Sequence, residues 1–241
     1  MVITFVPDEI TVIMRLIVIE GVDGSGKSTQ IKLLRDFFAS RNYRSEYLHF
    51  PRTNTPFFGE LIARFLRGEF GSLNEVDPYL VAMIYAGDRK DASPLINEWL
   101  QQGSYVLLDR YTYSNIAYQC AKIEDPAERE KLRKWILALE FEHFRIPEPG
   151  LNIFLDVPAS FTEQKLSASR NGSDRSYLNG NRDIHEEDLF FQKRVRDVYV
   201  NAAGTDKRIA VVECMDSEGK MMPPEKIFGI INGIIKERKL I

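Results

Sequence analysis

Residues 15–28 read RLIVIEGVDGSGKS, and this stretch decides the fold. It opens with a nearly continuous apolar run over 15–20, rich in β-branched residues, which is typical of a strand buried on both faces of a parallel sheet. A glycine-rich turn follows. After the turn, apolar residues such as Leu34 and Phe38 recur at helical spacing over 27–41. The stretch therefore predicts a strand, a tight turn and a helix in direct succession.

The turn over 21–28 matches the pattern G-x-x-x-x-G-K-[ST] of a P-loop. Its backbone N–H groups must turn inward on phosphate oxygens, and glycine permits the backbone angles and the close approach that this requires. Lys27 is placed to reach the β- and γ-phosphates of ATP, and the Ser28 hydroxyl can bind Mg²⁺. The helix that begins here adds the positive end of its dipole. We expect the turn to bind ATP through Gly21, Asp23, Gly24, Ser25, Gly26, Lys27, Ser28 and Thr29.

Strand and helix patterns alternate along the rest of the chain. Short apolar runs predict four further strands, at 45–50, 104–109, 151–157 and 208–213. Amphipathic spacing predicts helices at 56–67, 78–102, 126–144, 160–169, 186–202 and 224–239. The helix over 78–102 contains Pro94, so we expect it to be bent or broken there. This alternation predicts an α/β fold of the P-loop NTPase type, with a five-stranded parallel sheet flanked by helices.

The chain has 241 residues, no internal repeat and no long linker, so we expect a single domain over 1–241 with an N-terminal extension over 1–13. Asp8 and Glu9 interrupt the apolar stretch of this extension, which therefore does not have the pattern of a signal peptide. Two explanations stay open. Either translation starts at Met14, or the extension is a short tail that packs as an edge strand.

The composition is that of a soluble globular chain, which excludes a disordered or fibrous protein. Lysines and arginines number 32 and aspartates and glutamates 35, which gives a formal net charge of -3 and no general attraction to nucleic acid or membranes. Any bound anion must therefore be held by a local cluster of charge. Cys120 and Cys214 are too few for a disulfide framework, and no apolar run reaches the roughly 18–20 residues that span a bilayer. We expect a cytoplasmic location.

The third predicted strand ends in Asp109-Arg110-Tyr111. In an α/β sheet the carboxyl ends of the parallel strands share one edge with the P-loop. A carboxylate there can hold Mg²⁺ directly or through water, and the adjacent arginine can bind a second phosphate group. The sequence has neither an N-K-x-D motif nor an apolar strand that ends in an adjacent Asp-Glu pair. The pattern favours a reaction in which both substrates carry phosphate.

Four stretches follow one another in a distinctive order: 20–30, Phe-Pro-Arg over 50–52, 85–89, and 109–118. In this order, from about residue 15 to the last helix, the chain resembles the thymidylate kinase family of nucleoside-monophosphate kinases. The resemblance implies transfer of the γ-phosphoryl group of ATP to dTMP, giving dTDP and ADP, with Mg²⁺ as cofactor. It also implies a homodimer formed through helices beside the sheet, with ATP and dTMP as partners rather than nucleic acid or a membrane.

The resemblance further implies a dTMP site. Tyr85 would lie against the thymine ring, and Arg89 would hydrogen-bond its O4 edge. Arg110 would hold the dTMP phosphate with help from Arg52, although the family often has one more residue between the proline and the arginine of this motif. The full implied set is Asp23, Phe50, Arg52, Leu66, Tyr85, Arg89, Arg110, Ser114, Asn115, Tyr118 and Tyr177.

A polar stretch at about 166–185 resembles the lid of the family. It carries Arg170, Arg175 and Arg182 among glycines and asparagines, a composition that fits closure of a basic segment over polyphosphate. The variable position of the P-loop is Gly24, so the resemblance implies that catalytic positive charge comes from the lid, first of all from Arg175, with Arg170 at the ATP site. The implied catalytic residues are Lys27, Asp109, Arg110 and Arg175, and the implied metal ligands are Ser28 and Asp109.

We expect direct in-line transfer without a strong general base, because a phosphate monoester is already anionic near neutral pH. Lys27, Mg²⁺, Arg110 and a lid arginine would supply positioning and charge neutralisation. Two alternatives stay open. One is a kinase of the same fold that accepts dUMP, UMP or a deoxynucleoside. The other is a nucleotide-binding switch whose lid and last helix bind a protein partner, and which needs no acceptor to hydrolyse or hold nucleotide.

Overall fold

The computed structural model describes residues 15–158, 161–162, 178 and 189–241. The strands of this part of the chain are β1 (Leu16–Glu20), β2 (Ser45–His49), β3 (Tyr105–Asp109), β4 (Leu151–Asp156) and β5 (Ile209–Glu213). They form one parallel sheet in the order β2-β3-β1-β4-β5, so the predicted five-stranded parallel sheet is confirmed. Each predicted strand lies within one or two residues of the observed one.

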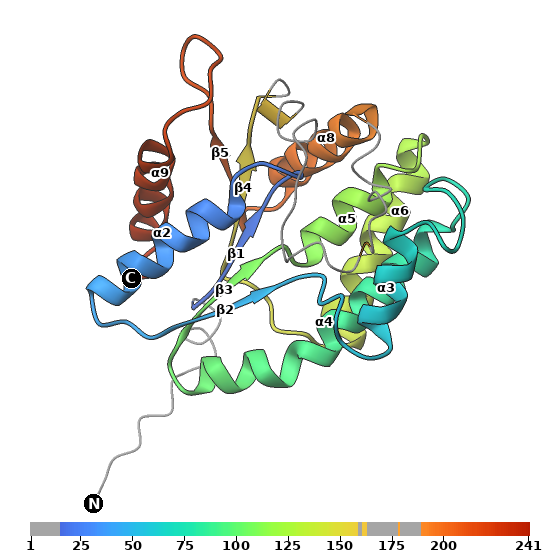
Figure 1. Ribbon diagram of the computed structural model, residues 1–241, viewed down its shortest axis with the longest axis horizontal. Helices are drawn as coiled ribbons and strands as arrows, with labels where there is room; N and C mark the ends of the chain where they lie inside the picture. The colour runs from blue at the N-terminus through green and yellow to red at the C-terminus, as the bar shows by residue number, and fades with distance from the viewer. Residues whose placement is uncertain (1–14, 159–160, 163–177, 179–188) are drawn as a thin grey trace, which may run out of the picture.

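Helices cover both faces of the sheet. They are α2 (Lys27–Ser40), α3 (Phe58–Leu66), α4 (Pro78–Gln101), α5 (Thr112–Cys120), α6 (Pro126–Leu137), η1 (Ala138–His143), α8 (Leu189–Thr205) and α9 (Pro224–Glu237). Helices α2 and α9 lie side by side on one face, and α3 to α6 gather on the other, as Figure 1 shows. Gln30 ties the first pair together by donating to the carbonyl of Pro224 at 3.1 Å. None of the described helices has the length and apolarity needed to cross a membrane.

The central strand β1 shows why this sequence needs helices on both sides. Ile17 and Ile19 belong to the apolar cluster that includes residues of α2, whereas Leu16 and Val18 belong to a second cluster that includes Ile96 of α4. All four side chains are completely buried. Since side chains alternate between the two faces of a strand, a continuous apolar run can be buried only between two layers.

Helix α4 differs from the prediction because it is not broken at Pro94. It runs without interruption over Pro78–Gln101, with Pro94 on its exposed side. Buried residues on either side of the proline, Ala92 and Ile96, pack into the cluster beneath β1 and β3 and hold both halves of the helix on the sheet. Burial of this face outweighs the hydrogen bond that proline cannot make.

Helix α5 is absent from the prediction. Every one of its residues, Thr112–Cys120, is buried, and the helix is enclosed by α4, α6 and α8. A helix that is covered on all sides has no polar face, so its sequence carries no amphipathic period.

The helix predicted over 126–144 is interrupted. Regular α6 ends at Leu137, and the chain continues as the π-helical turn η1, in which the Phe144 N–H donates to the Leu139 carbonyl at 2.8 Å. Such a turn contains one residue more than an α-helical turn. In this turn, Glu140 is completely buried.

Several predicted features lie outside the described residues. They are the N-terminal extension over 1–13 and nearly all of the helix over 160–169 and of the lid over 166–185. The lid residues Arg170, Arg175, Tyr177 and Arg182 are among them.

A surface network on this scaffold predicts a pH dependence of stability. Asp206 accepts hydrogen bonds from Tyr113 of α5 and from Arg208, which holds its pKa at about 2 although burial acts in the opposite direction. Because this folded-state pKa lies below the usual value of 3.8, the ionised carboxylate stabilises the fold above about pH 4. The contribution is lost as the pH falls towards 2.

We expect Asp206→Asn to lower the free energy of unfolding by about 1 kcal/mol at pH 7, a figure reduced for solvent screening. The difference from the unmodified protein should shrink steadily below pH 4, as measured by urea unfolding at several pH values. A difference that stays constant from pH 7 to pH 2.5 would contradict the role of Asp206.

Candidate active site

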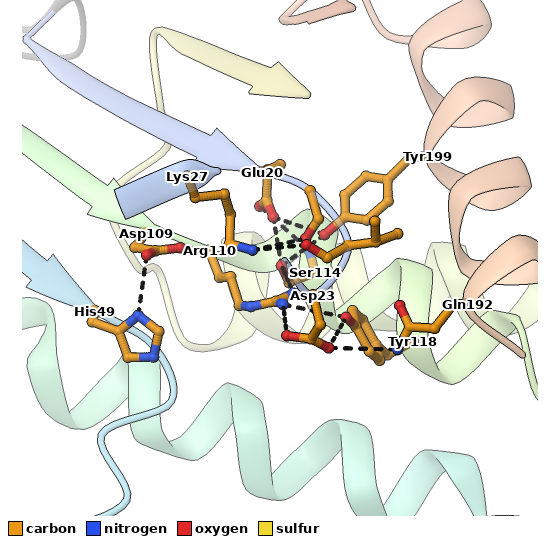
Figure 2. A network of polar contacts seen from close by, with 12 residues as sticks. Glu20, Asp23, Lys27, His49, Asp109, Arg110, Ser114, Tyr118, Gln192 and Tyr199 are labelled. Atoms are coloured by element: carbon orange, nitrogen blue, oxygen red, sulfur yellow. Dashed lines mark hydrogen bonds and ion pairs between the residues drawn. The ribbon is translucent and has the colours of Figure 1, made fainter. Parts of the chain in front are cut away.

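The carboxyl ends of the parallel strands place polar residues along one edge of the sheet. Strand β1 ends at Glu20, β2 at His49 and β3 at Asp109. In the sheet register Asp109 is the partner of both Ile19 and His49. The P-loop follows β1 and the Asp-Arg-Tyr turn follows β3, so the pairing of these two strands brings the two motifs together (Figure 2).

The P-loop has a backbone that only glycine accommodates without strain. Gly24 and Gly26 have φ angles of 75° and 87°, in the left-handed region. At Gly21 a Cβ atom would approach the Ser25 Oγ to 2.4 Å. Helix α2 begins at Lys27 with no side chain capping its first N–H groups. These donors, together with the helix dipole, are groups that can bind an anion.

Lys27 folds back over this loop. Its ammonium group donates to the carbonyl of Gly21 at 3.2 Å and to that of Val22 at 3.0 Å. Burial, reinforced by the nearby charge of Arg110, lowers the pKa of Lys27 to about 8. The lysine is therefore a buried cation at the loop, on the side where the loop faces the end of β3.

Arg110 joins the two motifs. Its Nη2 lies 2.7 Å from Oδ1 of Asp23 in the P-loop, and the same nitrogen donates to the hydroxyl of Tyr118 at 3.2 Å. Tyr118 in turn donates to Oδ2 of Asp23 at 2.8 Å, which Gln192 of α8 also approaches at 3.5 Å. The predicted residues Asp23, Arg110 and Tyr118 are thus in direct contact, beside Lys27 in Figure 2.

The backbone of Arg110 is held in an unfavourable conformation. Its φ is 66°, in the left-handed region that a residue with a side chain seldom occupies. Two hydrogen bonds hold the turn: the Arg110 N–H donates to the Ile19 carbonyl at 3.0 Å, and the Tyr111 N–H donates to Oε1 of Glu20 at 3.0 Å. This conformation gives Arg110 a fixed position, because strain of this kind persists only where neighbouring groups impose it.

Glu20 is the residue behind this turn, and the sequence assigned it no role. It is completely buried and accepts further hydrogen bonds from the Ser114 N–H at 3.3 Å, the Ser114 hydroxyl at 2.5 Å and the Tyr199 hydroxyl at 2.9 Å. Burial raises the pKa of Glu20. The carboxylate therefore links β1, the start of α5 and helix α8, as Figure 2 shows. The sequence does carry a signal for this role, because Glu20 is a charged residue at the end of an otherwise apolar strand.

Asp109 has the chemistry of a cation ligand. Its Oδ2 lies 3.4 Å from Nδ1 of His49, and its buried Oδ1 has no hydrogen-bond partner among the described residues. Burial pushes the pKa of Asp109 upwards, but the His49 hydrogen bond and the charges of Lys27 and Arg110 outweigh it and lower that pKa. Ser28, the second predicted ligand, is exposed at the start of α2.

Within the described ranges, no group of three or more His, Cys, Asp or Glu side chains could hold a metal ion. The oxygens of Asp109 and Ser28 nevertheless fit Mg²⁺ that is shared with substrate phosphates, because such an ion needs only one or two protein ligands.

A second group of predicted residues meets around Glu140. Arg89 donates to both carboxylate oxygens of Glu140, at 2.5 and 2.6 Å, and both side chains are at most 2% exposed. Asn115 donates through Nδ2 to Glu140 at 3.0 Å and to the Ala82 carbonyl at 3.0 Å. Its Oδ1 is buried without a hydrogen-bond partner in the described part of the chain.

The remaining predicted residues of the acceptor site surround these groups. Phe50 is buried with its ring centroid 5.6 Å from that of Tyr111, and Arg89 lies 6.0 Å from the same tyrosine ring. Arg52 contacts Asp88 and Asp91 of α4 rather than the P-loop: its Nε lies 2.8 Å from Asp88 and its Nη2 2.9 Å from Asp91.

Two further predicted residues lie in the apolar core beside this group. Leu66 is buried there, and Tyr85 packs against the same core. The structure therefore brings together most of the described predicted residues, in two clusters joined through α5. Glu20, His49, Glu140, Gln192 and Tyr199 are the contributors that the sequence did not single out.

The fold and the site together define a nucleotide-binding phosphotransferase of the P-loop class. Such a protein binds nucleotide where a glycine-rich loop passes from the first parallel strand into a helix. A family model described as thymidylate kinase matches residues 19–222. The chain belongs to the thymidylate kinase family and is an enzyme of that family.

Individual relatives agree with this assignment. A thymidylate kinase of Mycobacterium tuberculosis is 33% identical over 188 residues, which cover 78% of this chain and 85% of the relative. A probable thymidylate kinase of Thermococcus kodakarensis is 31% identical over 207 residues, 83% of this chain and 89% of the relative. The solved structure of thymidylate kinase from Candida albicans matches with a TM-score of 0.67 at 25% identity, over 93% of this chain and 92% of that one.

The role of Glu20 predicts a difference between two substitutions. In Glu20→Gln the new NH₂ group faces backbone and hydroxyl donors, so we expect a loss of about 1–3 kcal/mol in the free energy of unfolding. Tyr199→Phe leaves three hydrogen bonds to Glu20 and should cost about 1 kcal/mol or less. Urea unfolding at pH 7 measures both values. Equal stability of Glu20→Gln and the unmodified protein would show that this carboxylate does not hold the turn.

Proposed function

We propose that this protein transfers the γ-phosphoryl group of ATP to the 5′-phosphate of dTMP, giving dTDP and ADP. The observation that carries the proposal is the contact between Arg110 and the P-loop residue Asp23, with Lys27 beside them. Both cations lie at one edge of the sheet, which supports a role for them in binding a donor and an acceptor phosphate that meet there. Membership of the thymidylate kinase family supports the same reaction.

Catalysis in this proposal consists of positioning and charge neutralisation. Lys27 and Arg110 are buried and both lie beside the P-loop, where positive charge stabilises a transferring phosphoryl group. The acceptor phosphate is already an anion, and none of the proposed catalytic residues has to act as a strong base. Arg175 is proposed as the lid cation, with Arg170 at the ATP and Tyr177 at the nucleotide.

The family implies a divalent metal, and we propose Mg²⁺ held by Asp109 and Ser28. The buried Oδ1 of Asp109, which has no hydrogen-bond partner among the described residues, supports this assignment. When bound, the ion supplies neutralisation of the charge on the β- and γ-phosphates.

The second cluster supports a thymine or uracil acceptor over a cytosine one. Glu140 engages Nε and one N–H of Nη2 of Arg89, which leaves both N–H groups of Nη1 and the second N–H of Nη2 as donors for a ligand. Asn115 uses its Nδ2 on two protein acceptors, so Oδ1 is available as an acceptor. Thymine presents the matching edge, an O4 acceptor beside an N3–H donor. Cytosine presents the reverse, a donor beside an acceptor.

This reaction is expected in the cytoplasm, where both nucleotides occur, within a single kinase domain over 1–241. That domain includes the lid over 166–185 and the extension over 1–13.

The reaction is tested most simply with a panel of acceptors. With ATP and Mg²⁺, coupled ADP release should be fast with dTMP, slower with dUMP and UMP, and at least 10²-fold slower with dCMP. Without an acceptor it should be close to zero. Rapid ADP release that does not depend on any acceptor would support a nucleotide-binding switch and would overturn the proposal.

Substitutions connect that activity to the site. Lys27→Ala and Arg110→Ala should each lower kcat about 10²–10³-fold, because each removes a cation from the transferring phosphates. Arg133→Ala is a control of the same residue type, since Arg133 lies on α6 and pairs there with Glu130. It should leave kcat within twofold of the unmodified enzyme. Near-normal transfer by either active-site variant would exclude the role given to that residue.

A homodimer is the second part of the proposal. Exposed apolar side chains lie on α3 and α4 and include Leu80, 55% exposed, and Met83, 44% exposed. Phe58 packs beside them at Gly87, where a Cβ atom would approach its ring to 2.2 Å. Leu80, Met83 and Gly87 lie one turn apart, so they form a single stripe along α4.

We expect sedimentation equilibrium at micromolar concentration to give the mass of a dimer. Leu80→Asp combined with Met83→Asp should convert the protein to monomers. A monomer mass for the unmodified protein would overturn this part of the proposal.

A further inference from the structure

We propose that Glu140 is a positioning residue that determines the choice of base in the acceptor nucleotide. The inference rests on the proposed function, because it concerns how Arg89 and Asn115 present their hydrogen-bonding groups to that base. Glu140 itself would touch no substrate. It would act by fixing the orientation of the two side chains that do.

The carboxylate of Glu140 has a complete set of donors. Oε1 accepts from Arg89 Nη2 at 2.6 Å and from Asn115 Nδ2 at 3.0 Å, and Oε2 accepts from Arg89 Nε at 2.5 Å and from the Thr112 hydroxyl at 2.9 Å. A carboxylate offers about four lone-pair positions, so all of its acceptor capacity is used. Because the group is completely buried, each bond is made in a medium that strengthens it.

This arrangement fixes which groups remain for a ligand. The bidentate contact holds the Arg89 guanidinium in one plane and leaves both N–H groups of Nη1 and the second N–H of Nη2 as donors in fixed directions. For Asn115, the Ala82 carbonyl and the Glu140 carboxylate can only accept, so the NH₂ group must face them and the oxygen must face away. A fixed donor and a fixed acceptor result, and together they select an O4 and N3–H edge.

Glu140 lies on the buried side of its helix. Leu132 and Ile136, the buried residues of α6, precede it at intervals of four residues, which is helical spacing. A charged residue therefore occupies a position where an apolar one would continue the pattern, and it lies in the interior among α4 and α5 side chains. The residue belongs to the π-helical turn η1, and turns of this kind are frequent at functional sites.

The ion pair between Arg89 and Glu140 affects base selectivity separately from its effect on stability. A buried ion pair often contributes little to the free energy of folding, since desolvation of two charges offsets their attraction. Here the pair neutralises the buried Arg89, and an uncharged residue in place of Glu140 would leave that cation without its counter-ion. We therefore expect the two effects, on stability and on base selectivity, to be separable by the choice of substitution.

The test is Glu140→Gln, assayed with dTMP, dCMP and ATP. The glutamine NH₂ group must face Arg89, Asn115 or Thr112, so the guanidinium plane is lost and the Asn115 amide is free to turn over. We expect kcat/KM for dTMP to fall at least 30-fold. We also expect the ratio of kcat/KM for dTMP to that for dCMP to fall at least tenfold. The KM for ATP should stay within twofold.

Two control variants separate positioning from general destabilisation. Ile231→Ala removes a completely buried side chain of α9, on the opposite face of the sheet, and should lower stability without changing the dTMP to dCMP ratio. Thr112→Val removes one neutral donor from Glu140 and keeps its charge. It should fold, and should lower the same ratio by about twofold to fivefold.

A folded Glu140→Gln enzyme whose selectivity ratio is within threefold of the unmodified value would overturn the inference. If that variant does not fold, an unchanged ratio in Thr112→Val would overturn it instead. Failure of the proposed function is distinct from either result, because it would appear as absence of dTMP phosphorylation by the unmodified protein.

Discussion

The parallel pairing of β1 with β3 is the constraint on which the site depends. With Ile19 opposite Asp109, the P-loop and the Asp-Arg-Tyr turn leave the sheet at the same level and side by side. The contact between Arg110 and Asp23 then follows from geometry, and the left-handed backbone of Arg110 directs its side chain towards the loop. A shift of one residue in this register would turn every side chain of one strand to the other face and would separate the two motifs.

Two buried carboxylates hold other groups of the site in position by accepting hydrogen bonds. Glu20 accepts hydrogen bonds that hold the turn of Arg110, and Glu140 accepts hydrogen bonds that orient Arg89 and Asn115. Each is completely buried, so neither is available to substrate. Buried ionised groups are costly unless their partners are complete, which explains why both are surrounded by donors. Both carboxylates fix the orientation of side chains that we propose to contact substrate.

The sheet and the P-loop could be predicted from the sequence, because local patterns of residues indicate both. Apolar runs and a glycine-lysine-serine turn need no knowledge of distant residues. The sequence was insufficient for α5, whose burial on all sides leaves no amphipathic period, and for the role of Glu140, whose partner Arg89 lies 51 residues away in the chain. A local pattern also gives no sign of the partners of Arg52. These are Asp88 and Asp91 of α4, which lie 36 and 39 residues further along the chain. The family resemblance predicts Arg89 at the acceptor site, but it does not predict Glu140, the counter-ion that orients Arg89.

Direct transfer of one phosphoryl group requires ATP and dTMP to be bound at the two clusters at the same time. The transfer can be followed by incubating the enzyme with dTMP and ATP labelled with ³²P in the γ-phosphate, and separating the products. We expect the label in the β-phosphate of dTDP, in an amount equal to the ADP formed. Label released as inorganic phosphate, with dTMP unchanged, would contradict direct transfer.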